Sequence, residues 1–552
     1  MNASNGMEAT DSHQKFEYLL VFVFACLSLI GVLHHEMWRD ELQVWTLARD
    51  SSSVADLWRN MRTECHPMLW HTLVWVLTRF ARNPVAMQYL HWLIGVASVY
   101  VFVRCSPFTM LQKTLFCFGY YPLFEYCMIA RNYSLGMLLL FLFCWLMQRQ
   151  PRSYLAFAWV IGLMCCTHVY DWPLAAASFV VLISSSISGP TERQQVRRHW
   201  RRVVIAGSIL TLCALVAGTE MLVYTRQMPH LDPPSLHLNE FTRALTSVWR
   251  AYIPIPRSDS ESFLWNTNLL ADSSLTGQAF AIFLSYSLVI LLSALFWWWS
   301  RRAFLMYSLG TLLLLALELG TPIGSMRHHG RHWLLLLASC WLALDQSPVP
   351  EFTRLAAFWK RHGEHLFGDL ITVILAVHVL AGGIFYWSDI RLPFSTAKAT
   401  VRFLADNGLT DKPIVVSRDS CATSISGYLG RKVYAVDSGR MQSFLPFDST
   451  FYAHTNRPHK QILHEVIDML SDVTNQVIFI TSYRLTVEKN GKIQDLKRLE
   501  DPPNTRVTLL TEFNRALTDE QFSVYLVERV AGLSGVPAHG GQNNPSALDF
   551  SR

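Results

Sequence analysis

Acidic side chains that could act on a hydroxyl group stand directly after the first apolar segment of the chain. Asp40 and Glu41 lie in the sequence WRDELQVW, where tryptophans would hold them at a membrane boundary. A partly desolvated carboxylate there could serve as a general base, because desolvation raises its pKa. The alternatives are a metal ligand and a solvated helix start, since Asp and Glu favour the first turn of a helix. We predict Asp40 and Glu41 as catalytic residues.

A second group with ligand chemistry follows in the sequence TECHPMLWH. Glu64 and His66 could bind a divalent cation or the phosphate of a substrate, and Pro67 would open a helix where proline is tolerated. A lone histidine at a helix start is otherwise an ordinary hydrogen-bonded residue. We predict His66 as a phosphate ligand, and Glu64 with His66 as metal ligands.

Side chains that suit an anionic ligand recur at later turns between apolar segments. The guanidinium group of arginine matches two phosphate oxygens at once. The alternative for a single arginine is that it snorkels to the interface, but a dense basic run on the outer side is better explained by an anionic ligand. The predicted donor-binding and phosphate-binding residues, in addition to His66, are Arg131, Tyr133, His168, Arg327, His328 and Arg331.

The composition predicts a membrane protein that positions these residues. Of 552 residues, 51% are hydrophobic and only 16% charged, and apolar runs long enough to cross a hydrocarbon core fill the chain up to residue 388. The net charge of +6 is spread over short loops, which argues against nucleic-acid binding. The predicted spans are 16–35, 84–104, 108–129, 131–148, 153–170, 172–188, 202–224, 278–299, 303–320, 332–346 and 367–388.

Short basic loops predict the sidedness of these spans. The sequence ERQQVRRHWRR at 192–202 is the strongest, and such loops stay in the cytoplasm. Segment 36–83, the turn at 321–332 and everything after residue 388 are then outside, provided that the helix at 67–80 lies along the interface. The alternation of inside and outside loops then places six acids on the outer side of the membrane, namely Asp40, Glu41, Glu125, Asp171, Glu220 and Glu318.

The chain changes character after residue 388. Strands at 413–417, 432–436, 476–481, 505–511 and 521–528 alternate with amphipathic helices, which is typical of a small α/β domain. The predicted organisation is a transmembrane domain at 1–388, an extracytoplasmic α/β domain at 389–531 and a disordered tail at 532–552. The chain has no phosphate-binding glycine loop and no HExxH zinc helix.

Three motifs at compatible spacing resemble the GT-C superfamily of membrane glycosyltransferases, which includes the protein O-mannosyltransferases and the lipid A aminoarabinose transferases. They are Arg39-Asp40-Glu41 after the first span, Glu64-Cys65-His66-Pro67 opening the next helix, and Arg131-Asn132-Tyr133-Ser134-Leu135 at an outer turn. The sequence departs from the family at Met68, where the second proline of the usual motif is missing. The helix at 131–148 also lacks the acidic residue that some members carry.

The resemblance implies a GT-C-like fold: a polytopic α-helical membrane protein with interfacial helices in its first outer loop. It implies a sugar donor linked to polyprenyl phosphate and an inverting displacement, which needs one base, for which Asp40 is the candidate. The acceptor, a glycan, lipid or protein, and the use of a divalent metal stay open. The expected location is the bacterial inner membrane, among membrane lipids, with the active site on the periplasmic side.

Two other functions fit parts of the sequence. A transporter or flippase of a lipid-linked glycan would place ionisable groups near the bilayer midplane within repeated halves. Here these groups gather at one interface and no repeat is visible. A non-catalytic scaffold would explain the α/β domain but not the outer acids. We therefore predict a membrane glycosyltransferase, with the transporter as the alternative.

Overall fold

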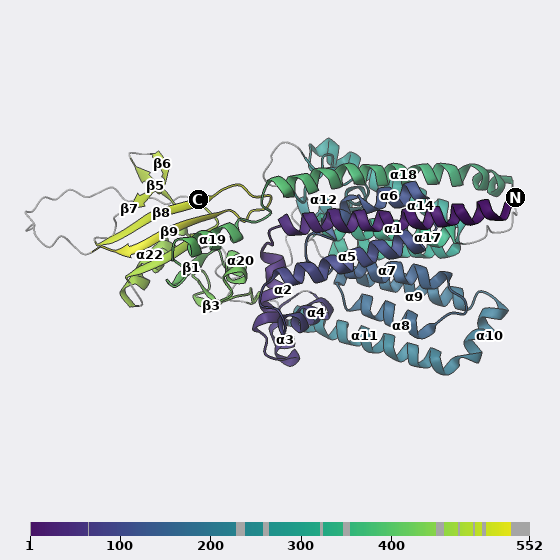
Figure 1. Cartoon of the computed structure of the whole chain (residues 1–552), viewed down its shortest axis with the longest axis horizontal. Helices are drawn as coiled ribbons and strands as arrows, with labels where there is room; N and C mark the ends of the chain where they lie inside the picture. Colours follow the sequence, from purple (N-terminus) through teal and green to yellow (C-terminus); the bar gives the residue numbers. More distant parts are fainter. Residues whose placement is uncertain are drawn as a thin grey trace, which may run out of the picture.

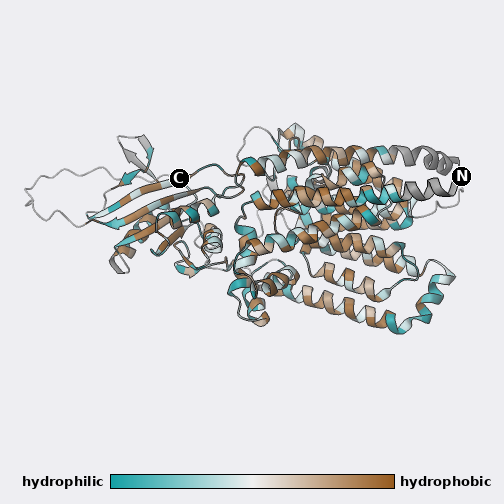
Figure 2. Cartoon of the chain, in the orientation of Figure 1, coloured by the Kyte–Doolittle hydropathy of each residue, from teal (hydrophilic) through white to brown (hydrophobic). Residues whose placement is uncertain are grey.

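The computed structural model describes residues 2–64, 66–227, 238–257, 264–320, 324–345, 354–448, 457–472, 475–489, 492–499 and 504–530. Cys65 of the second motif and the predicted tail at 532–552 lie outside these residues. A helical bundle extends to Arg391, and a domain built on a β-sheet follows beyond one end of the bundle (Figure 1). Hydrophobic residues line the helices along the length of the bundle (Figure 2).

Seven helical segments of the described residues are long and apolar enough to cross a membrane. The chain is therefore a polytopic α-helical membrane protein, because a helix of this kind buries its backbone polar groups within itself. Each of these segments matches a predicted span. They are Asp11–His34 in α1 (Asn2–His34), Val85–Cys105 (α5), Val169–Ser186 (η2 and α9), Trp200–Tyr224 in α11 (Trp200–Gln227), Leu275–Trp299 (α14), Arg301–Gly320 (α15, η3 and α16) and Phe367–Arg391 in α18 (Arg354–Arg391).

The other four predicted spans differ from the structure. The helices α7 (Tyr133–Gln148) and α8 (Tyr154–Cys165) are apolar but shorter than predicted. The predicted span 108–129 is broken into α6 (Met110–Cys117) and the π-helical η1 (Tyr120–Glu125), in which Pro122 cannot donate a backbone hydrogen bond. The helix α17 (Met326–Leu344) starts earlier than residue 332, so that its first turns hold a buried basic run.

Short helices gather at the bundle end that faces the sheet domain. The helices α2 (Arg39–Asp50), α3 (Val54–Asn60) and α4 (Leu69–Thr78) connect α1 to α5 there (Figure 1). With 10 residues, α4 is too short to cross a membrane, which agrees with the expectation that the helix at 67–80 does not span it. The basic helix α10 (Pro190–Arg198) lies at the opposite end of the bundle (Figure 1).

The sheet domain has three layers. Its seven-stranded sheet has the order β3-β2-β1-β4-β9-β8-β7, in which β2, β1 and β4 are parallel and the other neighbours antiparallel. Buried side chains alternate along the central strands, so that α22 covers one face while α19 and α20 cover the other. The helices are α19 (Ala397–Asp406), α20 (Asp419–Leu429) and α22 (His459–Asp472).

The strands that the sequence predicts are present, and short ones are added. The predicted strands are β1 (Ile414–Ser417), β2 (Val433–Ala435), β4 (Gln476–Thr481), β8 (Thr505–Phe513) and β9 (Phe522–Arg529). The additional strands are β3 (Arg440–Gln442), β7 (Arg498–Leu499) and the separate hairpin of β5 (Thr486–Lys489) and β6 (Lys492–Asp495). These additional strands are short, with two to four residues, and lack the apolar runs that mark the equally short β1 and β2 in the sequence.

The sheet domain docks on α2. The side chain of Gln43 donates to the carbonyl of Leu445 over 2.8 Å and accepts from its amide over 2.8 Å. On α20, the hydroxyl of Tyr428 donates to the carbonyl of Met37 over 3.2 Å. Gly427 lies so close to the Leu42 side chain that any larger residue would collide with it. The domain is thus fixed to the first helix after the first span.

Candidate active site

The first turn of α2 is fixed by Glu41, which is fully buried. Its carboxylate accepts hydrogen bonds from the amide of Trp38 over 3.2 Å and from the amide of Ala130 over 2.7 Å. It also contacts the ring of His35 over 3.1 Å. These contacts hold the start of α2 against the turn before α7, and they leave Asp40 as the acid of the pair that reaches solvent.

Two arginines from distant parts of the chain meet at Asp40. Its carboxylate lies 3.1 Å from the guanidinium of Arg327 and 4.0 Å from that of Arg131, and its side chain is 28% exposed. Arg131 also donates to the backbone carbonyl of Asp40. Burial raises the pKa of Asp40, but Arg131, Arg327 and then Arg39 outweigh it and hold the pKa below its usual range. Asp40 is therefore an ionised carboxylate at neutral pH.

His66 and Glu64 extend this cluster toward α4. A nitrogen of Arg131 lies 3.3 Å from Nε2 of His66, and Nδ1 of His66 lies 3.7 Å from Glu64. The other oxygen of Glu64 accepts from Gln43 over 2.5 Å. Burial raises the pKa of Glu64, but the contact with His66 and the neighbouring His71 outweigh this effect. The pKa therefore lies below its usual value, and the carboxylate stays charged.

Aromatic rings line the next part of the site. The ring of His168 lies 4.7 Å from that of His66 and 5.3 Å from that of His328. His328 stacks on Tyr170 at 4.6 Å, and its Nε2 is 3.4 Å from the hydroxyl of Tyr133. Nε2 of His168 is buried without a hydrogen-bond partner. It is therefore a group that a bound ligand could satisfy.

Arg331 is engaged by protein groups. Its fully buried guanidinium forms two bonds to the buried carboxylate of Asp171, over 2.9 and 3.2 Å, and a third to the hydroxyl of Tyr126 over 3.0 Å. It also lies 4.7 Å from the ring centre of Tyr133. Because Asp171 already neutralises its charge, Arg331 is suited to hold α7, α9 and α17 together.

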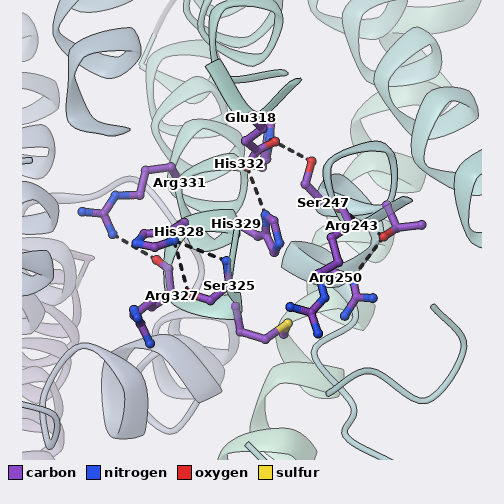
Figure 3. A network of polar contacts seen from close by, with 12 residues as sticks. Arg243, Ser247, Arg250, Glu318, Ser325, Arg327, His328, His329, Arg331 and His332 are labelled. Atoms are coloured by element: carbon purple, nitrogen blue, oxygen red, sulfur yellow. Dashed lines mark hydrogen bonds and ion pairs between the residues drawn. The ribbon is translucent and has the colours of Figure 1, made fainter. Parts of the chain in front are cut away.

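The basic run at the start of α17 divides between two sides of the helix. Figure 3 shows Arg327, His328 and Arg331 on one side and His329 and His332 turned toward Glu318. Each of these two rings lies 3.0 Å from a Glu318 oxygen. The sequence marked Glu318 only as one of several outer acids. Its role as the anchor of two histidines depends on helix packing that spacing does not reveal.

Tryptophans hold Arg327 in place. Its guanidinium lies 5.4 Å from the ring centre of Trp38 and 5.2 Å from that of Trp265. Such cation–π contacts stabilise an arginine beside a membrane without neutralising its charge. No motif in the sequence marks Trp265, which lies in a loop more than 200 residues after Trp38.

Two small cavities adjoin the Asp40 cluster and share Glu64 and His66. The inner one is also lined by Arg131, His71 and Asn132. Both ring nitrogens of His71 and the side-chain oxygen of Asn132 are buried there without hydrogen-bond partners. The outer one reaches Glu220. Unsatisfied polar groups around a cavity indicate a place for a polar ligand.

A metal ion would have two protein ligands at this place. Among the residues that the structure describes, no group of three or more histidine, cysteine or acidic side chains is arranged to hold one. Glu64 and His66 converge, so water or substrate oxygens would have to complete the coordination. The metal role of this pair therefore stays a prediction.

All the predicted site residues lie at the same end of the bundle. A series of contacts leads from Asp40 through Arg131, His66, His168 and His328 to Tyr133. Their convergence satisfies the requirement that the acids and the basic run of α17 share one side.

Comparison with known proteins gives matches only among solved structures. No family model and no curated protein sequence matches the chain. ArnT from Cupriavidus metallidurans bound to undecaprenyl phosphate matches with 11% identity and a TM-score of 0.47, over 95% of this chain and 99% of ArnT. The arabinofuranosyltransferase AftD from Mycobacteria matches with 14% identity and a TM-score of 0.35, over 93% of this chain and 41% of AftD.

Proposed function

We propose that the chain is a membrane glycosyltransferase that moves a sugar from a polyprenyl-phosphate donor to an acceptor hydroxyl at the outer face of a bacterial inner membrane. The observation that carries this proposal is the setting of Asp40. A single exposed carboxylate stands between the guanidinium groups of Arg131 and Arg327, beside a polar cavity and at the end of a membrane bundle. The motifs that resemble the GT-C superfamily supply Asp40 and Arg131, while Arg327 comes from the basic run of α17.

The reaction assigns a role to each group. The acceptor hydroxyl attacks the anomeric carbon, its proton passes to Asp40, and the bond from that carbon to the phosphate oxygen breaks on the opposite face. Polyprenyl phosphate leaves with the bonding electrons, and Arg131, Arg327 and His66 stabilise its charge. Glu41 and Arg331, which are fully buried, position α2 and α17.

Donor binding would also activate the base. In the structure the two arginines lower the pKa of Asp40, which makes the carboxylate a weak proton acceptor. A bound phosphate competes for both guanidinium groups, since each can bond two of its oxygens. Asp40 then loses part of its stabilisation and becomes more basic when the donor is in place.

The proposal is tested by Asp40→Asn in the purified full-length protein. Transfer from a panel of polyprenyl-phosphate-linked pentoses, hexoses and amino sugars should fall by about 10²–10⁴-fold, the usual contribution of a general base. The matched control is Asp406→Asn, which changes an acid with a 67% exposed side chain on α19. This variant should transfer as the wild type does.

Undiminished transfer by Asp40→Asn would remove Asp40 as the base. Movement of a labelled lipid-linked glycan across vesicles that hold the protein, without formation of a glycosidic bond, would favour the transporter instead. A metal requirement is examined in the same assay by adding a chelator, which lowers transfer only if Glu64 and His66 hold a needed ion.

A further inference from the structure

A second cluster of arginines lies away from Asp40, on the other side of α17. Figure 3 shows Arg243 and Arg250 beyond His329, separated from Arg327 and Arg331. They belong to α12 (Leu238–Leu245) and α13 (Ser247–Tyr252). Both line a cavity of about 210 Å³, larger than either cavity at the Asp40 cluster. Its other lining residues are Thr242, Ala271, Asp272 and Gln278.

The cavity carries more positive than negative charge among the described residues. Arg250 is only 2% exposed and forms two bonds to Asp272, over 2.9 and 2.5 Å. Asp272 also accepts from the amide of Asn268 over 2.6 Å, and its backbone carbonyl accepts from Arg257 over 2.5 Å. One lining carboxylate, that of Asp272, thus faces the two lining guanidinium groups of Arg243 and Arg250. Since Asp272 is committed to Arg250, the exposed Arg243 lines the cavity with a charge that an anionic ligand can bind.

The position of the cavity indicates a lipid as the source of that anion. Gln278 lies in the first turn of α14, which is a candidate membrane span, so the cavity stands where this helix meets the water phase. The same elements also carry exposed apolar side chains, namely Phe241 of α12 and Leu275 and Phe280 of α14. A molecule with an anionic head and apolar tails matches both surfaces.

We infer that the Arg243–Arg250 cavity binds the phosphate headgroup of an anionic membrane lipid, at a site separate from the one around Asp40. The buried pair of Arg250 and Asp272 forms the floor of this site, and Arg243 supplies the main contact to the phosphate. The inference does not depend on the proposed transfer reaction. A soluble phosphate compound shares the headgroup chemistry but lacks tails to cover the exposed apolar residues.

The site connects with the anchor of α17. Ser247, one turn before Arg250 on α13, lies 3.3 Å from Nε2 of His332, which contacts Glu318. A lipid held by Arg243 above the Arg250–Asp272 pair would therefore be linked through α13 to the helix that also carries Arg327. This placement fits a structural lipid that seats α12 and α13 against the bundle.

The test is lipid binding measured by native mass spectrometry on the full-length protein in detergent. Dioleoyl phosphatidylglycerol should bind more tightly to the wild type than the zwitterionic dioleoyl phosphatidylcholine. Arg243→Gln should weaken phosphatidylglycerol binding about tenfold, because one charge-assisted contact is lost. Arg243→Lys keeps the charge and should bind within about threefold of the wild type.

The matched control is Arg197→Gln, which removes an exposed arginine from α10 at the opposite end of the bundle. This variant should keep the wild-type affinity. Equal affinities of Arg243→Gln and Arg197→Gln would overturn the inference. Equally tight binding of sn-glycerol phosphate and phosphatidylglycerol would also overturn it, because the site would then hold a soluble anion and not a lipid. Unchanged melting temperatures show that the exposed substitutions leave the fold intact.

Discussion

At the scale of the residue, Asp40 combines an exposed carboxylate with a strongly positive surrounding. Its pKa lies below the usual range because Arg131 and Arg327 outweigh the effect of burial. A group with a depressed pKa keeps its charge until the pH falls through that lowered value. The acid limb of kcat/KM, which reports the protein without donor, should therefore lie below about pH 4, the ordinary pKa of aspartate.

Removal of one arginine should shift this limb. In Arg327→Gln the carboxylate loses the cation 3.1 Å away, so its pKa rises and the acid limb of kcat/KM moves to higher pH. The KM for the donor rises as well, because a phosphate contact is lost. The pH–rate profile measures both effects. Arg59→Gln, at a 63% exposed arginine of α3, is the control and should leave the profile unchanged. An unshifted limb in Arg327→Gln would contradict the coupling.

The residue types in the sequence predict which side chains gather at the site, but not what each contacts. Asp40 and Glu41 are adjacent and chemically alike, yet one reaches solvent and the other is fully buried. Likewise, Arg327 faces Asp40 while Arg331 is paired with Asp171. These differences depend on contact partners that lie more than 80 positions away in the sequence, and no local pattern encodes them.

At the scale of the element, the start of α2 is capped by an acid of the sheet domain. The carboxylate of Glu520 accepts from the amide of Arg39 over 3.1 Å and from the hydroxyls of Ser395 and Ser424 over 2.6 Å each. A helix start exposes unpaired amides, and a carboxylate there satisfies one of them. The sheet domain thereby fixes the turn that holds Asp40.

Loss of this cap should weaken both the fold and the reaction. Glu520→Ala leaves the amide of Arg39 and two serine hydroxyls without an acceptor, at a cost of about 1–3 kcal/mol per buried group. We expect a lower melting temperature and a lower kcat, while Glu520→Gln keeps most of the bonds and most of the activity. Thermal unfolding and initial rates measure these effects. Equal losses in both variants would contradict the role of the cap.

The pH dependence of this contact has a definite sign. Burial raises the pKa of Glu520 to about 7, although Arg39 and the two serines act against it. Since the folded-state pKa lies above the unfolded one, the contribution to stability is greatest at acid pH and falls as the pH rises toward about 7. In Glu520→Gln, which does not titrate, this part of the pH dependence should disappear.

The elements of the sheet domain could be predicted because strands and amphipathic helices alternate there over 396–528. In the bundle, the long apolar helices were equally accessible. The break at η1 could not be predicted, because it interrupts an apolar run. The early start of α17 could not be predicted either, because a hydropathy pattern treats a buried histidine or arginine as the end of a helix. Burial of such residues becomes possible only through partners such as Glu318 and Asp171.

At the scale of the whole molecule, His35 joins the first span, the site helix and the last span. Its ring is fully buried and lies 2.9 Å from Asp389 of α18 and 3.1 Å from Glu41 of α2. Burial lowers the pKa of His35, but Asp389 and Glu41 outweigh this effect and raise it to about 10. The imidazolium is therefore a buried charge that two acids compensate.

The stability of the protein should follow the titration of His35. The contribution of this group is fully present below about pH 6.5, the ordinary pKa of histidine, and is lost as the pH rises toward about 10. His35→Phe leaves two buried carboxylates without their cation and should cost about 3–5 kcal/mol. His34→Phe is the matched control, because His34 is exposed. Melting temperatures between pH 6 and 10 test this, and a pH-independent wild type would contradict it.

The contact between Arg39 and Glu520 spans 481 positions of the chain. The ribosome completes the first membrane helices long before it reaches the strand that follows Glu520, so the nascent bundle exists for a time with an uncapped α2. The turn that holds Asp40 can take its final place only after the last part of the chain has folded against α2. Under the proposed function, a truncated product that still inserts into the membrane would hold an unfinished turn at Asp40 and should not transfer sugar.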